Sequence, residues 1–207
     1  MNKDNYALLV ISKSPSELDW ILPVLERSKK KFTINTFISS PEIYKKIKKN
    51  RFLFNQLKQI SKQIIIPRFY DCFFLRLAKL LINKLPQTNE KFSKYLENII
   101  SKKIYTENYL KKRLIISKKK LKLIFHEESK NTPWINNFHK REDILTVRYP
   151  HALNIFRSKK VGFKNDLKYK NNLLILTPNK NNLSRFKEKY NIKNILVLNS
   201  NPRHDDF

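Results

Sequence analysis

The sequence predicts a three-layer α/β fold, in which a parallel sheet carries helices on both faces. Short apolar runs recur along the 207 residues, and amphipathic segments lie between most of them. Hydrophobic residues make up 41% of the chain and aromatic residues 12%, which is enough for a core. Because strands that are apolar on both faces are typical of a parallel sheet covered by helices, the expected fold is Rossmann-like.

Seven apolar runs are the expected strands. Each is four to seven residues long and is bounded by polar residues or proline, as a strand buried on both faces would be. The expected strands lie at 6–11, 32–38, 63–66, 121–125, 144–147, 173–176 and 195–198.

The segments between these strands carry helical patterns. After the first strand, Ser14 is the candidate N-cap and Pro15 lies in the first turn of the helix. An apolar stripe at helical spacing follows, through Leu18 and Leu25. Further helices are expected at 41–60 (either continuous or re-formed near its middle), 71–85, 90–101, 107–117, 133–138 and 182–190.

The chain divides into three parts. Residues 1–153 form the expected N-terminal domain, residues 154–172 are a polar linker that contains Gly162, and residues 173–207 begin a second α/β unit. Because that unit stops shortly after its last strand, we expect a truncated version of a longer protein.

The formal charge of +27 has two interpretations. Lysines that neutralise phosphates would bind nucleic acid of any sequence, or anionic lipid. However, Lys outnumbers Arg by 34 to 10 and Gly occurs once, a usage typical of an AT-rich genome, whereas phosphate recognition more often uses Arg. We therefore favour a lysine-enriched surface and keep a nucleic-acid-binding α/β protein as the alternative.

Two classes of protein are excluded. Cys72 is the only cysteine, which excludes a disulfide scaffold, and no uncharged apolar stretch reaches the ~18 residues of a membrane span. We expect a cytoplasmic protein. The basic and apolar helix at 71–85 could contact the inner face of the cell membrane, although packing against its own sheet is the preferred interpretation.

Polar residues that follow the predicted strands are the candidate site residues, because ligands of open α/β sheets gather at the carboxyl ends of the strands. The candidate bases are His126 and His151. The candidate substrate-binding residues are Ser12, Lys13, Ser14, Glu128 and Tyr149.

The segment 12–16 could capture an anion with its backbone N–H groups, although ordinary N-capping is preferred. There is no glycine-rich phosphate loop. We predict no metal and no cofactor, since nothing brings the histidines together as ligands.

Three blocks of sequence resemble the two-domain (GT-B-type) glycosyltransferase-like superfamily, closest to surface-polysaccharide proteins similar to CDP-glycerol glycerophosphotransferases and UDP-N-acetylglucosamine 2-epimerases. The first block is YALLVISKSPSELDWILPVLERSKKKFTINTFI. The second is LKLIFHEESKNTPWINNF with ILTVRYPHALNIF, where Pro150-His151-Ala152 resembles a "PHG" motif. The third, FKEKYNIKNILVLNSNPRHDDF, resembles the entry to the second domain.

The resemblance implies the first half of a GT-B fold that acts in cell-surface polysaccharide synthesis and is weak or inactive alone. The implied partners are a nucleotide-activated sugar or polyol donor, a polysaccharide or lipid-linked acceptor, and a C-terminal domain supplied as a separate chain. His151 would face the cleft between the domains. Pro202, Arg203 and Asp205 would form the second-domain motif. The sequence departs from the family pattern at two points. Ala152 stands in place of the motif glycine, and Gly162 is the only glycine in the chain.

Overall fold

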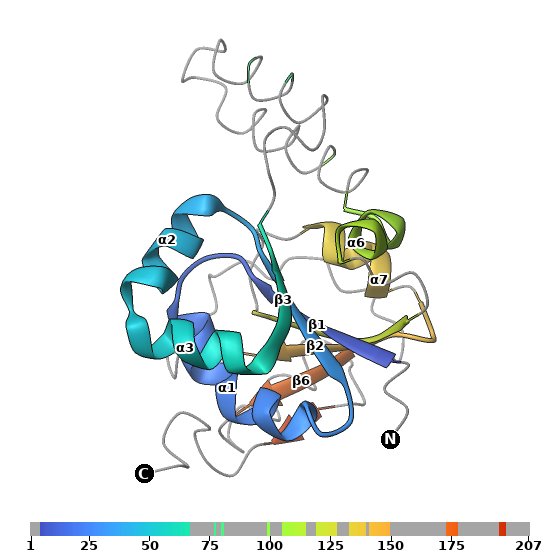
Figure 1. Ribbon diagram of the computed structural model, residues 1–207. Coiled ribbons are helices and arrows are strands. Elements are labelled where there is room, and N and C mark those ends of the chain that lie inside the picture. Colours follow the sequence, from blue (N-terminus) through green and yellow to red (C-terminus); the bar gives the residue numbers. More distant parts are fainter. Residues whose placement is uncertain are drawn as a thin grey trace, which may run out of the picture.

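The computed structural model describes residues 5–66, 105–114, 119–127, 133–139, 141–149, 173–177 and 195–197, with the single positions 77, 80 and 99. These residues form a seven-stranded sheet (Figure 1). All seven predicted strands are present, with ends that shift by at most two residues. They are β1 (Asn5–Ile11), β2 (Thr33–Ile38), β3 (Ser61–Ile65), β4 (Lys120–Glu127), β5 (Leu145–Tyr149), β6 (Leu173–Thr177) and β7 (Ile195–Val197).

The strand order reverses once, between β1 and β4. The order across the sheet is β3-β2-β1-β4-β5-β6-β7, and every neighbouring pair is parallel. This is the order of a doubly wound Rossmann-type sheet, in which the chain works outward from the centre first in one direction and then in the other. The predicted fold class is therefore confirmed.

The two late strands join this sheet, although we expected them to begin a second unit. β6 pairs with β5 from Thr146↔Leu173 onward, and β7 pairs with β6. The linker expected over 154–172 lies outside the described residues, so the position of a domain boundary is still a prediction.

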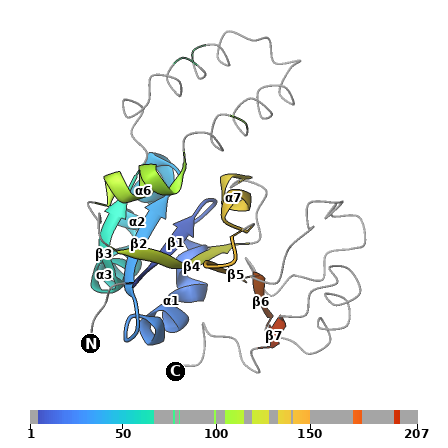
Figure 2. The same ribbon diagram turned by 90° about the vertical axis from the view of Figure 1, so that its right-hand side faces the viewer.

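Helices cover both faces of the sheet (Figures 1 and 2). The helices α1 (Ser16–Ser28), α2 (Pro41–Lys49) and α3 (Arg51–Ile60) lie on one face. The other face carries α6 (Glu107–Arg113) and the short η2 (Pro133–Ile135) and α7 (Asn136–His139). The expected helices at 71–85, 90–101 and 182–190 lie outside the described residues, apart from Leu77, Leu80 and Ile99.

The alternation of side chains along β1 divides the interior into two cores. Ala7, Leu9 and Ile11 pack with the helices α1, α2 and α3. Tyr6 and its alternate neighbours in β1 pack instead with α6, η2 and α7. Because every residue from Tyr6 to Ile11 is fully buried, the continuous apolar run that predicted β1 is explained by a strand covered on both sides.

Side-chain caps set the limits of the helices beside β3. Ser40 accepts a hydrogen bond from the backbone N–H of Ile43 (3.2 Å) and begins α2. Asn50 ends α2 and accepts from the N–H of Leu53 (3.2 Å), which begins α3. The helix expected over 41–60 is therefore re-formed at Asn50.

Among the described residues, no helix combines the length and the apolar character that crossing a bilayer requires. Leu77 and Leu80, the two described leucines of the helix expected at 71–85, are 42% and 54% exposed.

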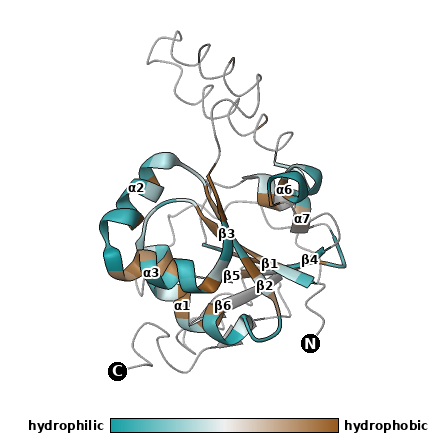
Figure 3. Ribbon diagram, in the orientation of Figure 1, coloured by the Kyte–Doolittle hydropathy of each residue, from teal (hydrophilic) through white to brown (hydrophobic). Residues whose placement is uncertain are grey.

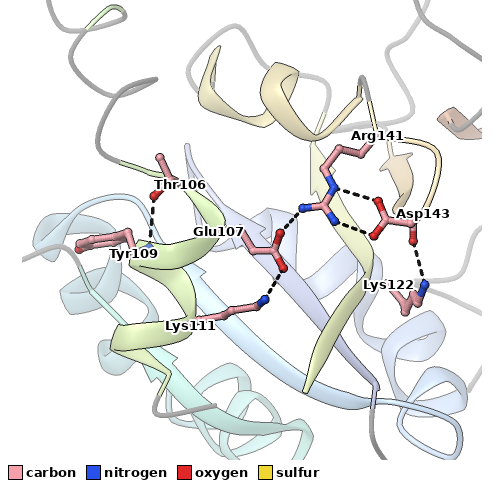
Figure 4. Close-up of polar contacts among 7 residues, drawn as sticks. All are labelled: Thr106, Glu107, Tyr109, Lys111, Lys122, Arg141 and Asp143. Atoms are coloured by element: carbon pink, nitrogen blue, oxygen red, sulfur yellow. Dashed lines mark hydrogen bonds and ion pairs between the residues drawn. The ribbon is translucent and has the colours of Figure 1, made fainter. Parts of the chain in front are cut away.

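A charged network ties α6 to the turn before β5 (Figure 4). The guanidinium of Arg141 donates two hydrogen bonds to the carboxylate of Asp143, at 2.8 and 2.6 Å, and a third to Glu107. Glu107 also pairs with Lys111 at 2.9 Å. Because Arg141 and Asp143 precede β5, this network lies at the amino edge of the sheet, opposite the edge where ligands bind in this fold.

Replacing Glu107 with glutamine should lower the free energy of unfolding, by an amount that depends on pH. Burial alone would raise the pKa of Glu107, but hydrogen bonds from Lys111 and Arg141 hold it below its ordinary value. A lowered folded-state pKa adds stability that is complete above the unfolded-state pKa of about 4.3 and is lost as the pH falls through the folded-state value. Urea unfolding should give E107Q a deficit of about 1 kcal/mol at neutral pH that vanishes in acid. An equal deficit at all pH values would contradict this.

Candidate functional site

The loop after β1 and the end of β4 meet at the carboxyl edge of the sheet, where the strand order reverses. Val10 pairs with His126, so Ser12, Lys13 and Ser14 follow β1 beside the last residues of β4. This position between oppositely wound halves is where doubly wound sheets bind ligands. The register therefore places these two strand ends side by side.

The carboxylate of Glu17 fills the loop after β1. It accepts hydrogen bonds from three consecutive backbone N–H groups, those of Ser12 (3.0 Å), Lys13 and Ser14 (2.7 Å). Glu17 is fully buried. These N–H groups are among those that we considered for binding an anion, and they already donate to a carboxylate of the same chain.

The start of α1 differs from the prediction for this reason. The helix begins at Ser16 with Pro15 as its N-cap residue, and the side chain of Ser14 does not act as a cap. The hydroxyl groups of Ser14 and Ser16 instead lie 2.5 Å apart. Glu17 accepts instead from N–H groups that precede the helix, including that of Ser14, which is the acid's half of a capping box without the serine's half.

Glu127 is a second buried acid at this edge. β4 runs two residues further than predicted, so Glu127 is part of the strand and its side chain is 1% exposed. Its carboxylate lies 3.8 Å from the ammonium group of Lys13, whose side chain is 50% exposed. Lys13 therefore lies between the solvent and the buried acid.

Tyr149 lies beside Glu127, at the end of β5 and on the α1 side of the sheet. It pairs with Glu127 in the sheet register, is fully buried, and stacks on Trp20 of α1 with ring centroids 6.3 Å apart and planes 8° apart. Burial raises the pKa of Tyr149, and the nearby Glu17 and Glu127 raise it further. The phenol therefore stays protonated, as a neutral hydroxyl beside two acids.

Burial also raises the pKa of Glu17, and its N–H donors with Lys13 offset part of that rise.

His126 points to the other face of the sheet. Residues of β4 alternate, and His126 pairs with Arg148 in the register, so both side chains lie on the α6 and α7 side. His126 is 5% exposed and its Nδ1 lies 2.9 Å from the backbone carbonyl oxygen of Glu127. Because a carbonyl only accepts, Nδ1 carries a proton.

The predicted site residues are thus brought together in part. Ser12, Lys13 and Ser14 follow β1, and Tyr149 ends β5 on the α1 side, whereas the side chain of His126 in β4 lies on the opposite side. The other predictions lie outside the described residues, so their placement is untested. They are His151, Glu128, Pro202, Arg203 and Asp205.

Sequence reasoning missed Glu17 and Glu127. The spacing Ser14-x-x-Glu17 is the capping-box pattern, in which the acid returns to the backbone at the start of the helix. Leu123 and Phe125 lie on the same buried side of β4. Because strand residues alternate, the same pattern places Glu127 on that side, which was a signal for its burial. Trp20 and Arg148 carried no such signal.

Within the described part of the chain, no three His, Cys, Asp or Glu side chains are grouped as metal ligands would be. No protein-family model matches the sequence, and no curated protein matches it either.

Proposed function

We propose that this chain is the acceptor-side half of a glycosyltransferase-like protein of cell-surface polysaccharide synthesis, and that the β1–β4 edge binds a hydroxyl-rich acceptor. Two things support the proposal. The strand order reverses at this edge, and the three blocks of sequence resemble the first domain and the domain entry of such transferases.

The loop after β1, whose N–H groups bind Glu17, is the reason why we propose a neutral ligand and not a phosphate. In doubly wound folds that bind nucleotides, free N–H groups and glycines at this loop hold the phosphates. Here Glu17 takes the N–H groups, so they are not available to hold a pyrophosphate. A neutral sugar or polyol suits the edge better, since the exposed Lys13 and the hydroxyls of Ser14 and Ser16 can bond its hydroxyl groups.

The proposed chemistry is displacement at a nucleotide-activated sugar or polyol phosphate. An acceptor hydroxyl forms the new bond, the nucleotide leaves with the electron pair of the broken bond, and a histidine takes the proton. His126 and His151 are the two candidate bases. His126 points to the side opposite Lys13 and Ser14, so His151 is the proposed base beside these residues, and the donor would be held by the partner domain.

A thermal-shift screen of the full chain tests the ligand class. The panel contains a neutral oligosaccharide (N,N′-diacetylchitobiose), glycerol, UDP-N-acetylglucosamine and CDP-glycerol, each at low and high salt. A ligand at 100 times its Kd stabilises the native state by about 2.7 kcal/mol. We expect the neutral acceptors to raise the Tm, and salt-resistant stabilisation by the nucleotides alone would contradict the proposal.

Replacing Lys13 with glutamine should weaken acceptor binding by about tenfold, because Lys13 is the exposed cation of the edge. Lys112→Gln is the matched control, since Lys112 is an exposed lysine of α6 on the opposite face. Isothermal titration of both variants with the selected acceptor measures the difference. Equal affinities would remove Lys13 from the site.

A further inference from the structure

The positive charge is unevenly distributed over the described body. Residues 29–62 hold ten Lys or Arg and a single acid, Glu42, whereas residues 5–28 hold two cations and three acids. Compositional drift alone would enrich both segments. The difference is between α1, which is acidic, and the adjacent helices α2 and α3, which are basic.

Helices α2 and α3 present an exposed basic face, which we call the α2–α3 face. Their inward sides are apolar and packed in the core, and the outward sides are hydrophilic (Figure 3). The face carries Lys45, Lys46, Lys48, Lys49, Arg51 and Lys58, all of them exposed.

One large apolar side chain stands among these cations. Phe52 is the second residue of α3, after Arg51, and is 64% exposed. The neighbouring Phe54 is held differently, since it packs edge-on against Tyr44 and lies under the ammonium group of Lys58, 4.5 Å from the ring centroid. Phe52 is therefore an exposed apolar residue in a segment, 45–58, that also exposes six cations.

We propose that the α2–α3 face docks on an anionic lipid surface, with Phe52 inserted among the headgroups. Charge complementarity favours this occupant, because clustered lysines near a membrane attract anionic lipids additively and an aromatic side chain adds apolar burial. Single-stranded nucleic acid would be held on several stacked aromatic side chains, whereas this face exposes one.

The α2–α3 face adjoins the candidate site. Ser39, which leads into α2, donates its N–H to the carbonyl of Ile11 (2.8 Å) and its hydroxyl to the carbonyl of Ser12 (3.1 Å). The start of α2 is thus bonded to the loop that follows β1. Docking through α2 and α3 would hold that loop close to the lipid surface, where a lipid-linked molecule is presented.

Vesicle flotation of the full chain tests the docking. The probes are vesicles of phosphatidylcholine alone and of phosphatidylcholine with phosphatidylglycerol. We expect binding to the anionic vesicles only, weakened by added salt. Phe52→Ser should reduce the binding about tenfold, and Lys49→Gln with Arg51→Gln about 10- to 30-fold. The control, Lys112→Gln with Lys120→Gln, removes the same charge from exposed positions outside the face.

Three results would overturn the proposal: no binding to anionic vesicles, an equal loss in the control double variant, or no effect of Phe52→Ser. Loss of RNA binding in the α2–α3 variants with unchanged vesicle binding would assign the face to nucleic acid and also overturn it. Circular dichroism confirms that each variant is folded. The result is independent of the acceptor screen, which uses no lipid.

Discussion

Replacing Glu17 with alanine is expected to lower the free energy of unfolding by about 3–6 kcal/mol, because three N–H groups of a partly buried loop lose their acceptor. That is a large fraction of the ~5–15 kcal/mol that holds a domain folded. Thermal unfolding should show a fall of ~10 °C or more. Asp19→Ala is the control, since Asp19 lies in the same turn of α1 and is only partly buried. Equal losses in the two variants would show that Glu17 does not hold the loop.

Glu17→Gln separates the hydrogen bonds from the charge. Its one oxygen can accept from Lys13 and Ser14, but its NH₂ group would face the N–H of Ser12. Because burial raises the pKa of Glu17, its proton is held more tightly in the folded state. The stability that this tighter binding of the proton adds to the folded state is complete below the ordinary pKa of about 4.3. It is lost as the pH rises through the raised pKa. The advantage of the wild type over E17Q should therefore shrink as the pH rises.

Replacing Trp134 with alanine is expected to cost about 3–5 kcal/mol, because a large side chain is removed from the second core. Trp134 of η2 is 2% exposed and packs against Phe37, Tyr105 and Phe138 with ring centroids 5.2 to 6.0 Å apart. Denaturant unfolding measures the loss. The size of this loss tests whether η2 and α7 cover the sheet as a third layer.

Two variants control for the change at Trp134. Trp134→Phe keeps part of the packing and should lose less. Phe52→Ala removes an aromatic side chain that is 64% exposed, and should change stability by less than about 0.5 kcal/mol. A loss at Trp134 as small as that at Phe52 would contradict the three-layer packing.

The fold was largely predictable because its strands are continuous apolar runs. A strand buried on both faces needs no alternation, so YALLVI and LKLIF stand out from their polar surroundings. The placement of the late strands was not predictable, since LLIL and ILVL would suit either a new sheet or the edge of the first. Only the pairing of β6 with β5 distinguishes these cases.

The candidate site was predictable in position but only partly in composition. Strand ends located Ser12, Lys13 and Tyr149, because topology alone brings those ends together. The buried acids were missed because Glu17 and Glu127 look like ordinary surface residues in a sequence. Their burial depends on N–H groups of the loop and on Lys13, contacts that only the folded chain creates.

We propose above that the edge between β1 and β4 binds an acceptor. Amide chemical shifts of the ¹⁵N-labelled full chain, titrated with the acceptor selected by thermal shift, test it most directly. We predict that the amides of 12–14 and of His126 and Glu127 shift together, while those of α6 stay in place. Shifts confined to the amino edge, around Glu107 and Arg141, would contradict the claim.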